Sequence, residues 1–415
     1  MSDITVIGGG VAGCTISYLL NQEGHDVTIL EKSHIGGLLR EIEFDSGHHC
    51  DSAPHILFFD EETEGEVREL FEEFSRLQFH EFYAKSFPTR NLSEPHDYPV
   101  TRSNIAKWDD ADRIEEELAA AEGRTDADFF DEYMLKQVGN SLYDRYYKNY
   151  TAKHWGIDPS RITGDWFDFK ISFPDEEDTF FGGESAYPDE KYTTILNEMI
   201  EGGDVRFEGV SGLNTHNGDI DSLRTEQGNE VRSDLFVSTI DPSILVDNAD
   251  IELNYRSMII LGIRVRLSER PFPSHVSWGY FPNDYEFTRV TDYDFVDQSL
   301  DDDEYILTIE FPCFTDEELW SNEQGWFEEY MRSFFDEQGI NGEIEESEIR
   351  RAPRAYPLPV TEEIEKFETL NSELSEYESM FNLGRVSTYE YIWIKDIVRQ
   401  AYETADEIQE SALTP

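Results

Sequence analysis

The stretch Ile4-Thr5-Val6-Ile7-Gly8-Gly9-Gly10-Val11-Ala12-Gly13 decides the fold of this chain. Residues 4–7 predict a short apolar strand, residues 8–13 form a GxGxxG turn, and residues 12–20 are an apolar helical stretch. A second apolar strand is predicted over residues 27–30. Together these segments predict a βαβ unit, the opening of a dinucleotide-binding fold.

Each glycine of the turn has a physical role in that unit. Gly8 permits the tight turn, Gly10 lets a pyrophosphate approach backbone N–H groups at the helix N-terminus, and Gly13 lets helix and strand pack closely. Glu31, at the end of the second strand, is placed to accept a hydrogen bond from a ribose hydroxyl. The stretch His34-Ile35-Gly36-Gly37 follows directly, and a second glycine pair there favours FAD over NAD. The alternative is a glycine turn that binds no ligand.

The composition excludes several classes of function. The 415 residues include 90 Asp and Glu against 33 Lys and Arg, a formal net charge of −57. Such a surface repels nucleic acids and anionic membranes. The chain is nevertheless 38% apolar and 13% aromatic, which argues for a packed core and against a disordered acidic chain. Its length suggests two or three domains.

The distribution of charged and apolar residues predicts the source and the cellular location of the protein. The acidic excess is even along the chain, which predicts a halophilic source over a specific cation- or partner-binding role. We find no apolar run near ~20 residues and no leader pattern, so we expect a soluble, cytoplasmic protein without membrane insertion. Cys14, Cys50 and Cys313 are too few and too scattered for a disulfide framework or a metal site.

The remaining pattern predicts an α/β fold with three parts. It is helical over residues 66–156, rich in β-forming residues over 258–265, 287–291 and 305–311, and helical again over 394–408. We therefore expect a Rossmann-like FAD-binding domain with a helical insert domain and an antiparallel β-sheet domain. The predicted boundaries are residues 1–65, 187–250 and 376–415 for the FAD-binding domain, 66–160 for the helical nucleotide-binding domain, and 161–186 with 251–375 for the sheet domain.

One segment carries a family resemblance. Residues 142–156, LYDRYYKNYTAKHWG, resemble the YTxKxWG segment of UDP-galactopyranose mutases, a family of FAD enzymes. Further short matches follow in the same order as in the family: HIGG at 34–37, PHI at 54–56, YRS at 255–257, FTR at 287–289, YP at 356–357, GR at 384–385 and TYEY at 388–391. The resemblance spans residues 4–405.

The resemblance implies roles for individual residues. The catalytic set is Arg289, His55, Tyr356, Tyr391 and Arg256. The cofactor-binding set is Gly8, Gly10, Val11, Ala12, Gly13, Glu31, Lys32, Gly36, Gly37, Leu38 and Arg385. The substrate-binding set is Tyr146, Tyr147, Tyr150, Trp155 and Tyr192, with Arg289, Tyr356 and Tyr391 on the sugar diphosphate. Against this stand plainer interpretations: aromatic residues at helical spacing in a core, arginines paired with carboxylates, and a structural His55.

The activity implied by the resemblance is an isomerisation without net redox change. In that family N5 of reduced FAD attacks the anomeric carbon of a nucleotide-diphosphate sugar, and the ring-opened sugar recloses through another hydroxyl. The implied partners are that sugar substrate and an external flavin reductant such as NAD(P)H, with a homodimer left open. The implied setting is the biosynthesis of cell-surface glycans.

Three departures from the family pattern concern the lid and the sugar. Residues 170–174, KISFP, replace a lid segment that carries an arginine; Phe58 replaces a second histidine; and Trp393 replaces an aspartate, with Asp396 three residues on. These changes predict retained cofactor and nucleotide binding with an altered sugar pocket. Two alternatives stay open: an FAD oxidoreductase of the amine-oxidase or desaturase type, and a degenerate flavoprotein that binds a nucleotide sugar without converting it.

Overall fold

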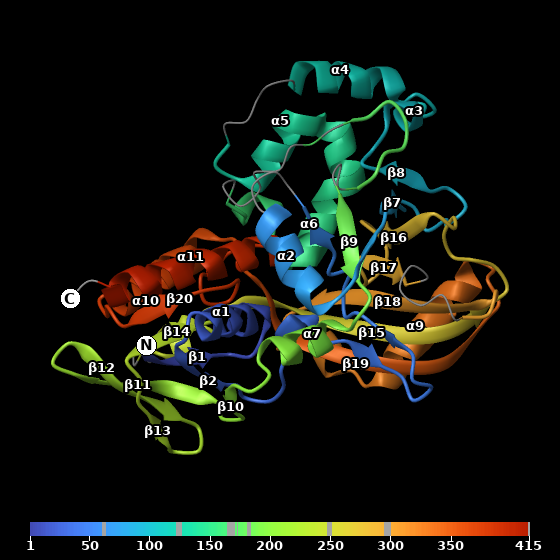
Figure 1. Ribbon diagram of the computed structural model, residues 1–415. Helices are drawn as coiled ribbons and strands as arrows, with labels where there is room; N and C mark the ends of the chain where they lie inside the picture. Colours follow the sequence, from blue (N-terminus) through green and yellow to red (C-terminus); the bar gives the residue numbers. More distant parts are fainter. Residues whose placement is uncertain are drawn as a thin grey trace.

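The computed structural model describes residues 1–59, 64–121, 127–163, 171, 173–180, 184–246, 251–293 and 300–413. The predicted βαβ unit forms the centre of a five-stranded sheet of order β10-β2-β1-β14-β20, in which every pairing is parallel. The start, middle and end of the chain all contribute strands (Figure 1). The predicted Rossmann-like α/β fold is confirmed. The strands are β1 (Asp3–Ile7), β2 (Asp26–Leu30), β10 (Asp204–Arg206), β14 (Leu235–Ser238) and β20 (Met380–Asn382).

Four helices share one hydrophobic core with this sheet. They are α1 (Val11–Gln22), α2 (Glu64–Phe74), α7 (Tyr192–Met199) and α11 (Ile394–Leu413). Ile16 and Leu20 of α1 meet Val398 of α11 in that core because apolar residues at helical spacing line one side of each helix. The helix predicted over residues 394–408 is present and continues to Leu413.

A second sheet of seven strands has the order β19-β15-β18-β17-β16-β7-β8. Its pairings are antiparallel except β16 with β7. Helix α9 (Gln324–Glu337) packs on it through Phe327, Met331 and Phe334. Two predicted strand regions lie inside β15 and β18, and the third begins two residues late, at Arg289. The strands are β7 (Tyr83–Ser86), β8 (His96–Tyr98), β15 (Tyr255–Leu267), β16 (Val276–Tyr280), β17 (Arg289–Asp292), β18 (Glu304–Cys313) and β19 (Gly342–Pro357).

The helical part stands above the two sheets in Figure 1. It comprises α3 (Arg102–Ile105), α4 (Ala111–Ala121), α5 (Phe130–Leu142), η2 (Tyr143–Tyr147) and α6 (Lys148–Trp155). The segment η2 is a π-helix, a wider turn that carries one extra residue between α5 and α6. Ile114, Met134, Val138, Tyr146 and Trp155 form the core of this part.

The domain boundaries remain a prediction, but the structure differs locally from the predicted helical range. Strands β7 and β8 lie in that range and join the large sheet, and α2 packs with the Rossmann-like core. β7 pairs with β16, nearly 200 residues later, and a local sequence pattern holds no information about such a distant partner.

Smaller elements complete the fold. A three-stranded sheet of order β5-β9-β6 holds the segment that follows His55. These elements are η1 (Gly37–Leu39), β3 (Ile42–Glu43), β4 (His49–Cys50), β5 (Leu57–Phe58), β6 (Leu77–Phe79), η3 (Pro159–Arg161), β9 (Ser185–Pro188), β11 (Val210–His216), β12 (Asp219–Thr225), β13 (Glu230–Val231), η5 (Pro242–Ile244), α8 (Glu318–Ser321) and α10 (Thr361–Leu374).

Candidate active site

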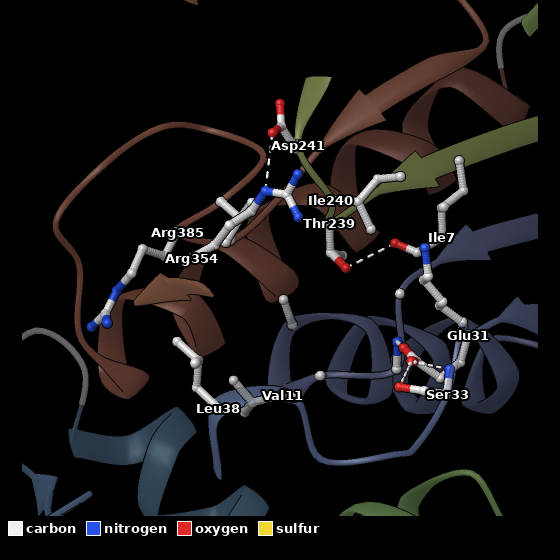
Figure 2. Close-up of a pocket in the computed structure, with 18 of the residues that line it drawn as sticks. Ile7, Val11, Glu31, Ser33, Leu38, Thr239, Ile240, Asp241, Arg354 and Arg385 are labelled. Atoms are coloured by element: carbon white, nitrogen blue, oxygen red, sulfur yellow. Dashed lines mark hydrogen bonds and ion pairs between the residues drawn. The ribbon is translucent and has the colours of Figure 1, made fainter. Parts of the chain in front are cut away.

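A cavity of about 700 Å³ opens at the carboxyl ends of β1, β2 and β14 (Figure 2). We call it the cofactor cavity. It reaches from Glu31 to Arg385, which lie at opposite ends of the residues drawn in Figure 2. Ligands of open parallel sheets bind at this edge of the strands. Of the predicted cofactor residues, those that line the cavity are Gly8, Gly10, Val11, Ala12, Glu31, Lys32, Gly37, Leu38 and Arg385.

The glycine turn shows that a dinucleotide fits this cavity. A Cβ added to Gly13 would lie 1.9 Å from the carbonyl oxygen of Gly8, so Gly13 serves close packing of α1 on β1. A Cβ added to Gly10 would meet only the Cα of Gly37, at 3.8 Å. Packing within the protein therefore does not require a glycine at position 10. Gly10 is the N-cap of α1 and gives it no side-chain cap, which leaves backbone N–H groups at the end of the helix that favours an anion.

Glu31 is fixed at the end of β2 by backbone donors. Its carboxylate accepts hydrogen bonds from the backbone N–H groups of Gly9 at 2.7 Å, Ser33 at 2.8 Å and His34 at 3.2 Å. The Ser33 hydroxyl also donates to the oxygen that Ser33 and His34 bind, at 3.5 Å, while the other oxygen accepts from Gly9 and has a second acceptor position. Lys32 lies beside it and pairs with Glu226 at 2.6 Å. Gly36 does not line the cavity; a Cβ there would lie 2.9 Å from the side chain of Thr193.

His55 lines the cavity in a fixed orientation. Its Nδ1 lies 2.7 Å from a carboxylate oxygen of Asp51, which is fully buried and also accepts from the hydroxyl of Tyr187 at 3.2 Å. The hydroxyl of Tyr192 donates to the backbone carbonyl of His55. Tyr192 is 1% exposed and supports His55 through this bond, while its predicted place in the substrate-binding set stays a prediction.

A second group of polar side chains begins with Arg289. Arg289 on β17 faces Glu310 on β18 across the sheet register, and the guanidinium Nε and Nη2 lie 2.7 and 2.6 Å from one oxygen of that carboxylate. Burial alone would lower the pKa of Arg289, but the charge of Glu310 outweighs burial and raises that pKa above its ordinary value. The guanidinium also lies over the ring of Tyr280, 6.0 Å from its centroid.

Aromatic rings extend from Arg289 toward the cofactor cavity. Tyr150 stacks on His154 at 5.6 Å and meets Tyr280 edge-on at 5.7 Å. Tyr356 lies 5.2 Å from His154 and 5.5 Å from Tyr391, measured between ring centroids. We call this group the arginine–tyrosine cluster: Arg289, Glu310, Tyr150, Tyr280, His154, Tyr356 and Tyr391.

Arg385 joins the cluster to the cofactor cavity. Its guanidinium lies over the rings of Tyr356 and Tyr391, at 5.2 and 5.5 Å. It also donates to the carbonyl oxygens of Ile392 at 2.6 and 3.1 Å and Ala355 at 3.2 Å. The same residue lines the cavity, so the cofactor and substrate halves of the candidate site are contiguous.

Burial sets the protonation of the cluster. It lowers the pKa of His154 to about 3, and the nearby charges of Arg256, Arg289 and Lys153 act in the same direction. It also raises the pKa of the Tyr150, Tyr280 and Tyr356 hydroxyls. At neutral pH the histidine is therefore uncharged, and the phenols keep their protons as hydrogen-bond donors.

Several predicted site residues have other surroundings. Tyr146 is 4% exposed and its hydroxyl lies 2.5 Å from Nδ1 of His96, so it belongs to the helical core. Trp155 is also in that core, although its ring touches those of Tyr356 and Tyr391. Tyr147 is half-buried at the edge of the same core. Tyr146, Trp155 and Tyr147 therefore occupy positions that the plainer interpretation also predicts, namely those of aromatic residues at helical spacing in a core.

Arg256 lies outside the cluster. Its guanidinium donates to the carbonyl oxygens of His154 at 2.8 Å, Lys153 at 2.9 Å and Pro312 at 3.1 Å, and it is 3% exposed. These bonds tie the C-terminal end of α6 to β18, where a helix leaves carbonyl groups without partners. These contacts give Arg256 a positioning role in the fold, and its place in the catalytic set stays a prediction.

Sequence reasoning missed Glu310, Tyr280 and Asp51. Glu310 carried a usable signal, because it is the one charged residue within the β-rich run of residues 305–311. Tyr280 and Asp51 gave no local signal. Their roles depend on the register of β16 with β17 and on the position of His55.

Two departures from the family pattern meet in space. The rings of Phe58 and Trp393 are in edge contact, with centroids 4.7 Å apart. Asp396 does not replace the missing aspartate, because its carboxylate accepts from the backbone N–H of Trp393 at 2.9 Å at the start of α11. In the lid segment Lys170 and Ser172 lie outside the described residues, while Ile171 and Phe173 pack against the helical core.

Other kinds of site find no support in the described ranges. No group of three or more His, Cys, Asp and Glu side chains there could hold a metal ion. Cys14, Cys50 and Cys313 are buried free thiols. Among the same residues, every helix is too short or too polar to cross a membrane.

Comparison with known proteins gives a consistent result. A family model described as UDP-galactopyranose mutase matches residues 145–332, and one described as an NAD(P)-binding Rossmann-like domain matches residues 6–74. The dTDP-fucopyranose mutase of Escherichia coli is 23% identical over 418 residues, covering 98% of each chain. A probable UDP-galactopyranose mutase of Klebsiella pneumoniae is 27% identical over 168 residues, 39% of this chain and 42% of that protein.

Solved structures show the same fold. A crystal structure of reduced UDP-galactopyranose mutase has a TM-score of 0.82 at 18% identity, covering 99% of this chain and 94% of that one. A redesigned putrescine oxidase has a TM-score of 0.64 at 12% identity, covering 99% of both chains. The family match and the mutase relatives imply a flavin cofactor and support a mutase-like flavoenzyme at the level of the family. In sequence and in fold, this chain resembles the UDP-galactopyranose mutases.

Proposed function

We propose that the protein is an FAD-dependent isomerase that interconverts the pyranose and furanose forms of a nucleotide-diphosphate sugar. One observation carries this proposal. Arg289, a partly buried cation paired with Glu310, lies over the ring of Tyr280 in a cluster that Arg385 joins to a dinucleotide-sized cavity. An isomerase of this kind must hold a sugar diphosphate beside a flavin, and the two contiguous halves of the site suit those two groups.

The cofactor half would hold FAD through the glycine turn, Glu31 and the residues around Leu38 and His55. In its reduced form, FAD supplies the electron pair that reacts at the anomeric carbon. His55, bound to Asp51 through Nδ1, would fix the orientation of the flavin-side wall. His55 would act as a positioning residue, because its hydrogen bond to Asp51 holds the imidazole ring in one orientation.

The diphosphate would lie against Arg289, Tyr356 and Tyr391. Departure of the nucleotide concentrates negative charge on the diphosphate, and donors aimed at that charge lower the barrier most in a partly dry site. The guanidinium forms a charge-assisted contact and the protonated phenols donate neutral hydrogen bonds. In a chain of net charge −57, such a cation also offsets the repulsion of a dianionic ligand.

The described cluster offers no poised acid or base to the sugar. Burial lowers the pKa of His154 to about 3, and its ring is stacked on Tyr150. This suits a reaction in which the side chains hold the reactants in place and stabilise the leaving diphosphate. We also expect a flavin reductant such as NAD(P)H, since the flavin must be reduced before the first turnover.

The test is a screen of nucleotide sugars with purified flavoprotein at molar KCl, comparing dithionite-reduced with oxidised enzyme. Pyranose and furanose forms are separated by chromatography. We expect interconversion with reduced enzyme alone. Equal turnover in both flavin states, or consumption of a stoichiometric oxidant, would reject the mutase and favour an oxidoreductase such as the amine oxidases that share this fold. Tight binding without turnover would favour a degenerate binder.

A further inference from the structure

Lys153, on α6, binds the loop that leads into the arginine–tyrosine cluster. This loop, residues 281–288, joins β16 to β17, and Arg289 is the first residue after it. The Nζ group of Lys153 donates to three backbone carbonyl oxygens of the loop, those of Phe281 at 2.5 Å, Phe287 at 2.8 Å and Tyr285 at 2.9 Å. An ammonium group has three N–H donors, so the loop accepts all of them.

The surroundings of Lys153 differ from those of a surface lysine. Among the described residues it forms no ion pair, whereas Lys148 on the same helix pairs with Asp144 at 3.5 Å. Burial lowers the pKa of Lys153 to about 7, while the carboxylates of Glu286 and Asp284 and the three carbonyl acceptors favour its charged form. Only an ammonium group offers three donors on one atom, so a neutral side chain could not bind the loop in this way.

A second contact ties the same loop to the same helix. The side-chain amide of Asn149, four residues before Lys153 on α6, donates to the side-chain oxygen of Asn283 at 2.8 Å. Asn283 in turn donates to the carbonyl oxygen of Pro88 at 2.9 Å. Every second residue of the loop, at positions 281, 283, 285 and 287, therefore contacts α6.

The helix and the loop belong to different halves of the cluster. Helix α6 carries the rings of Tyr150 and His154, which are stacked on each other. The loop joins the two strands whose facing residues, Tyr280 and Arg289, belong to the same cluster. The bonds of Lys153 therefore connect the rings on α6 with the guanidinium on β17.

We propose that Lys153 is a positioning residue for Arg289; this inference rests on the proposed function. The ammonium group fixes the loop against α6 and so holds the guanidinium where the sugar diphosphate would lie. All three donors of Lys153 are used by the loop, so the lysine acts through Arg289 and not on the substrate. A shift of about 1 Å in a group that stabilises the transition state can cost on the order of a hundredfold in rate.

The test compares Lys153→Met with Lys148→Met. Methionine keeps most of the length of the side chain and removes all three donors, and the control removes an equal charge from an exposed position on the same helix. With reduced enzyme we expect Lys153→Met to lower kcat about tenfold with FAD still bound, because Arg289 is displaced but present. The control should keep the kcat of the wild type.

Combination with Arg289→Ala shows whether Lys153 acts through that arginine. In the Arg289→Ala background, Lys153→Met should cause no further loss of kcat, because the group that it positions is gone. Equal losses in both backgrounds would overturn the inference, since they would mean that Lys153 supports the fold in general.

A binding measurement tests the same point without turnover. Calorimetry on the oxidised flavoprotein compares UDP with uridine and dTDP with thymidine, so the difference within each pair isolates the diphosphate. Lys153→Met should weaken binding of the diphosphate about threefold or more and leave nucleoside binding unchanged, since one charge-assisted contact is misplaced. In the Arg289→Ala background the same substitution should change neither.

These two readouts separate failure of the inference from failure of the proposed function. A wild type that binds UDP or dTDP but converts no nucleotide sugar would reject the mutase, and the binding measurement would still decide the role of Lys153. A working mutase in which Lys153→Met matches Lys148→Met in kcat and in binding would overturn the inference alone. A wild type that binds neither diphosphate would overturn both.

Asn149→Ala replaces Lys153→Met if that variant does not fold. It removes only the second contact between loop and helix, so it should show the same pattern at smaller size. If Asn149→Ala lowered neither kcat nor the affinity for the diphosphate, the inference would be wrong.

Discussion

The glycine turn of the cofactor cavity and the arginine–tyrosine cluster are built in different ways. The turn belongs to one continuous βαβ unit, where Gly10 and Gly37 leave space at the end of α1, although much of the rest of the cavity lining comes from residues 209–244, 353–354 and 384–397. The cluster is made of large side chains from α6, β16, β17, β18, β19 and the segment before α11. The turn proposed to hold the cofactor phosphates thus forms from a short local sequence, while the cluster proposed to hold the substrate depends on the register of a whole sheet.

The largest expected effect concerns the glycine turn. Gly10→Val should fold but purify without flavin, because a side chain there has room in the protein and would collide only with the pyrophosphate. Absorbance at flavin wavelengths and circular dichroism measure the two properties.

Gly13→Val is the matched control. Its Cβ would lie 1.9 Å from the Gly8 carbonyl oxygen, so this variant should lose its fold and not merely its flavin. If the Gly10→Val protein keeps a full complement of FAD, the proposal that the cofactor cavity binds FAD is wrong. A colourless wild type that takes up NAD would do the same.

The next effect separates two arginines. Arg289→Ala should lower turnover about a hundredfold with FAD still bound, since one charge-assisted contact to a developing anion contributes about 3 kcal/mol to the barrier. Arg256→Ala should instead lower the melting temperature, because it leaves three buried carbonyl groups without a donor. Kinetics per bound flavin and thermal melting distinguish the two.

A companion variant controls for the carboxylate that Arg289→Ala leaves buried. Adding Glu310→Gln should restore stability to the Arg289→Ala protein without restoring turnover. If stability and turnover returned together, Arg289 would be a structural partner of Glu310 and the cluster would lose its proposed function.

The last prediction concerns the effect of salt on the melting temperature. Each carboxylate contributes little to this effect, but the contributions of all surface carboxylates add up. Lowering the ionic strength from 1 M to 0.01 M lengthens the Debye length from ~3 to ~30 Å and exposes each carboxylate to many others. With a net charge of −57, the melting temperature should rise steeply with KCl. Calorimetric scans from low to molar KCl measure it, and a flat profile would mean that the acidic surface is not an adaptation to salt.

The sequence was informative where structure is local. The glycine turn, β1, α1 and β2 were predictable because each depends on neighbours within 30 residues. The apolar runs that became β15 and β18 were also visible. β7 and the environment of Arg256 were not, because strand pairing and the direction of a strand side chain are settled by distant partners. The contact of Phe58 with Trp393 lay beyond any pattern of spacing.

Because of the π-helical turn η2, the geometry of the candidate site depends on the number of residues between α5 and α6. The extra residue between α5 and α6 rotates everything after it by about 100° relative to an unbroken α-helix. Tyr150 and His154 point as they do only because that residue is present, while Tyr146 remains in the helical core. Deleting Asp144 or Arg145 would keep every aromatic side chain and turn the stacked pair away from Tyr280. A relative could thus keep the same aromatic residues and still lose the site through a single-residue gap.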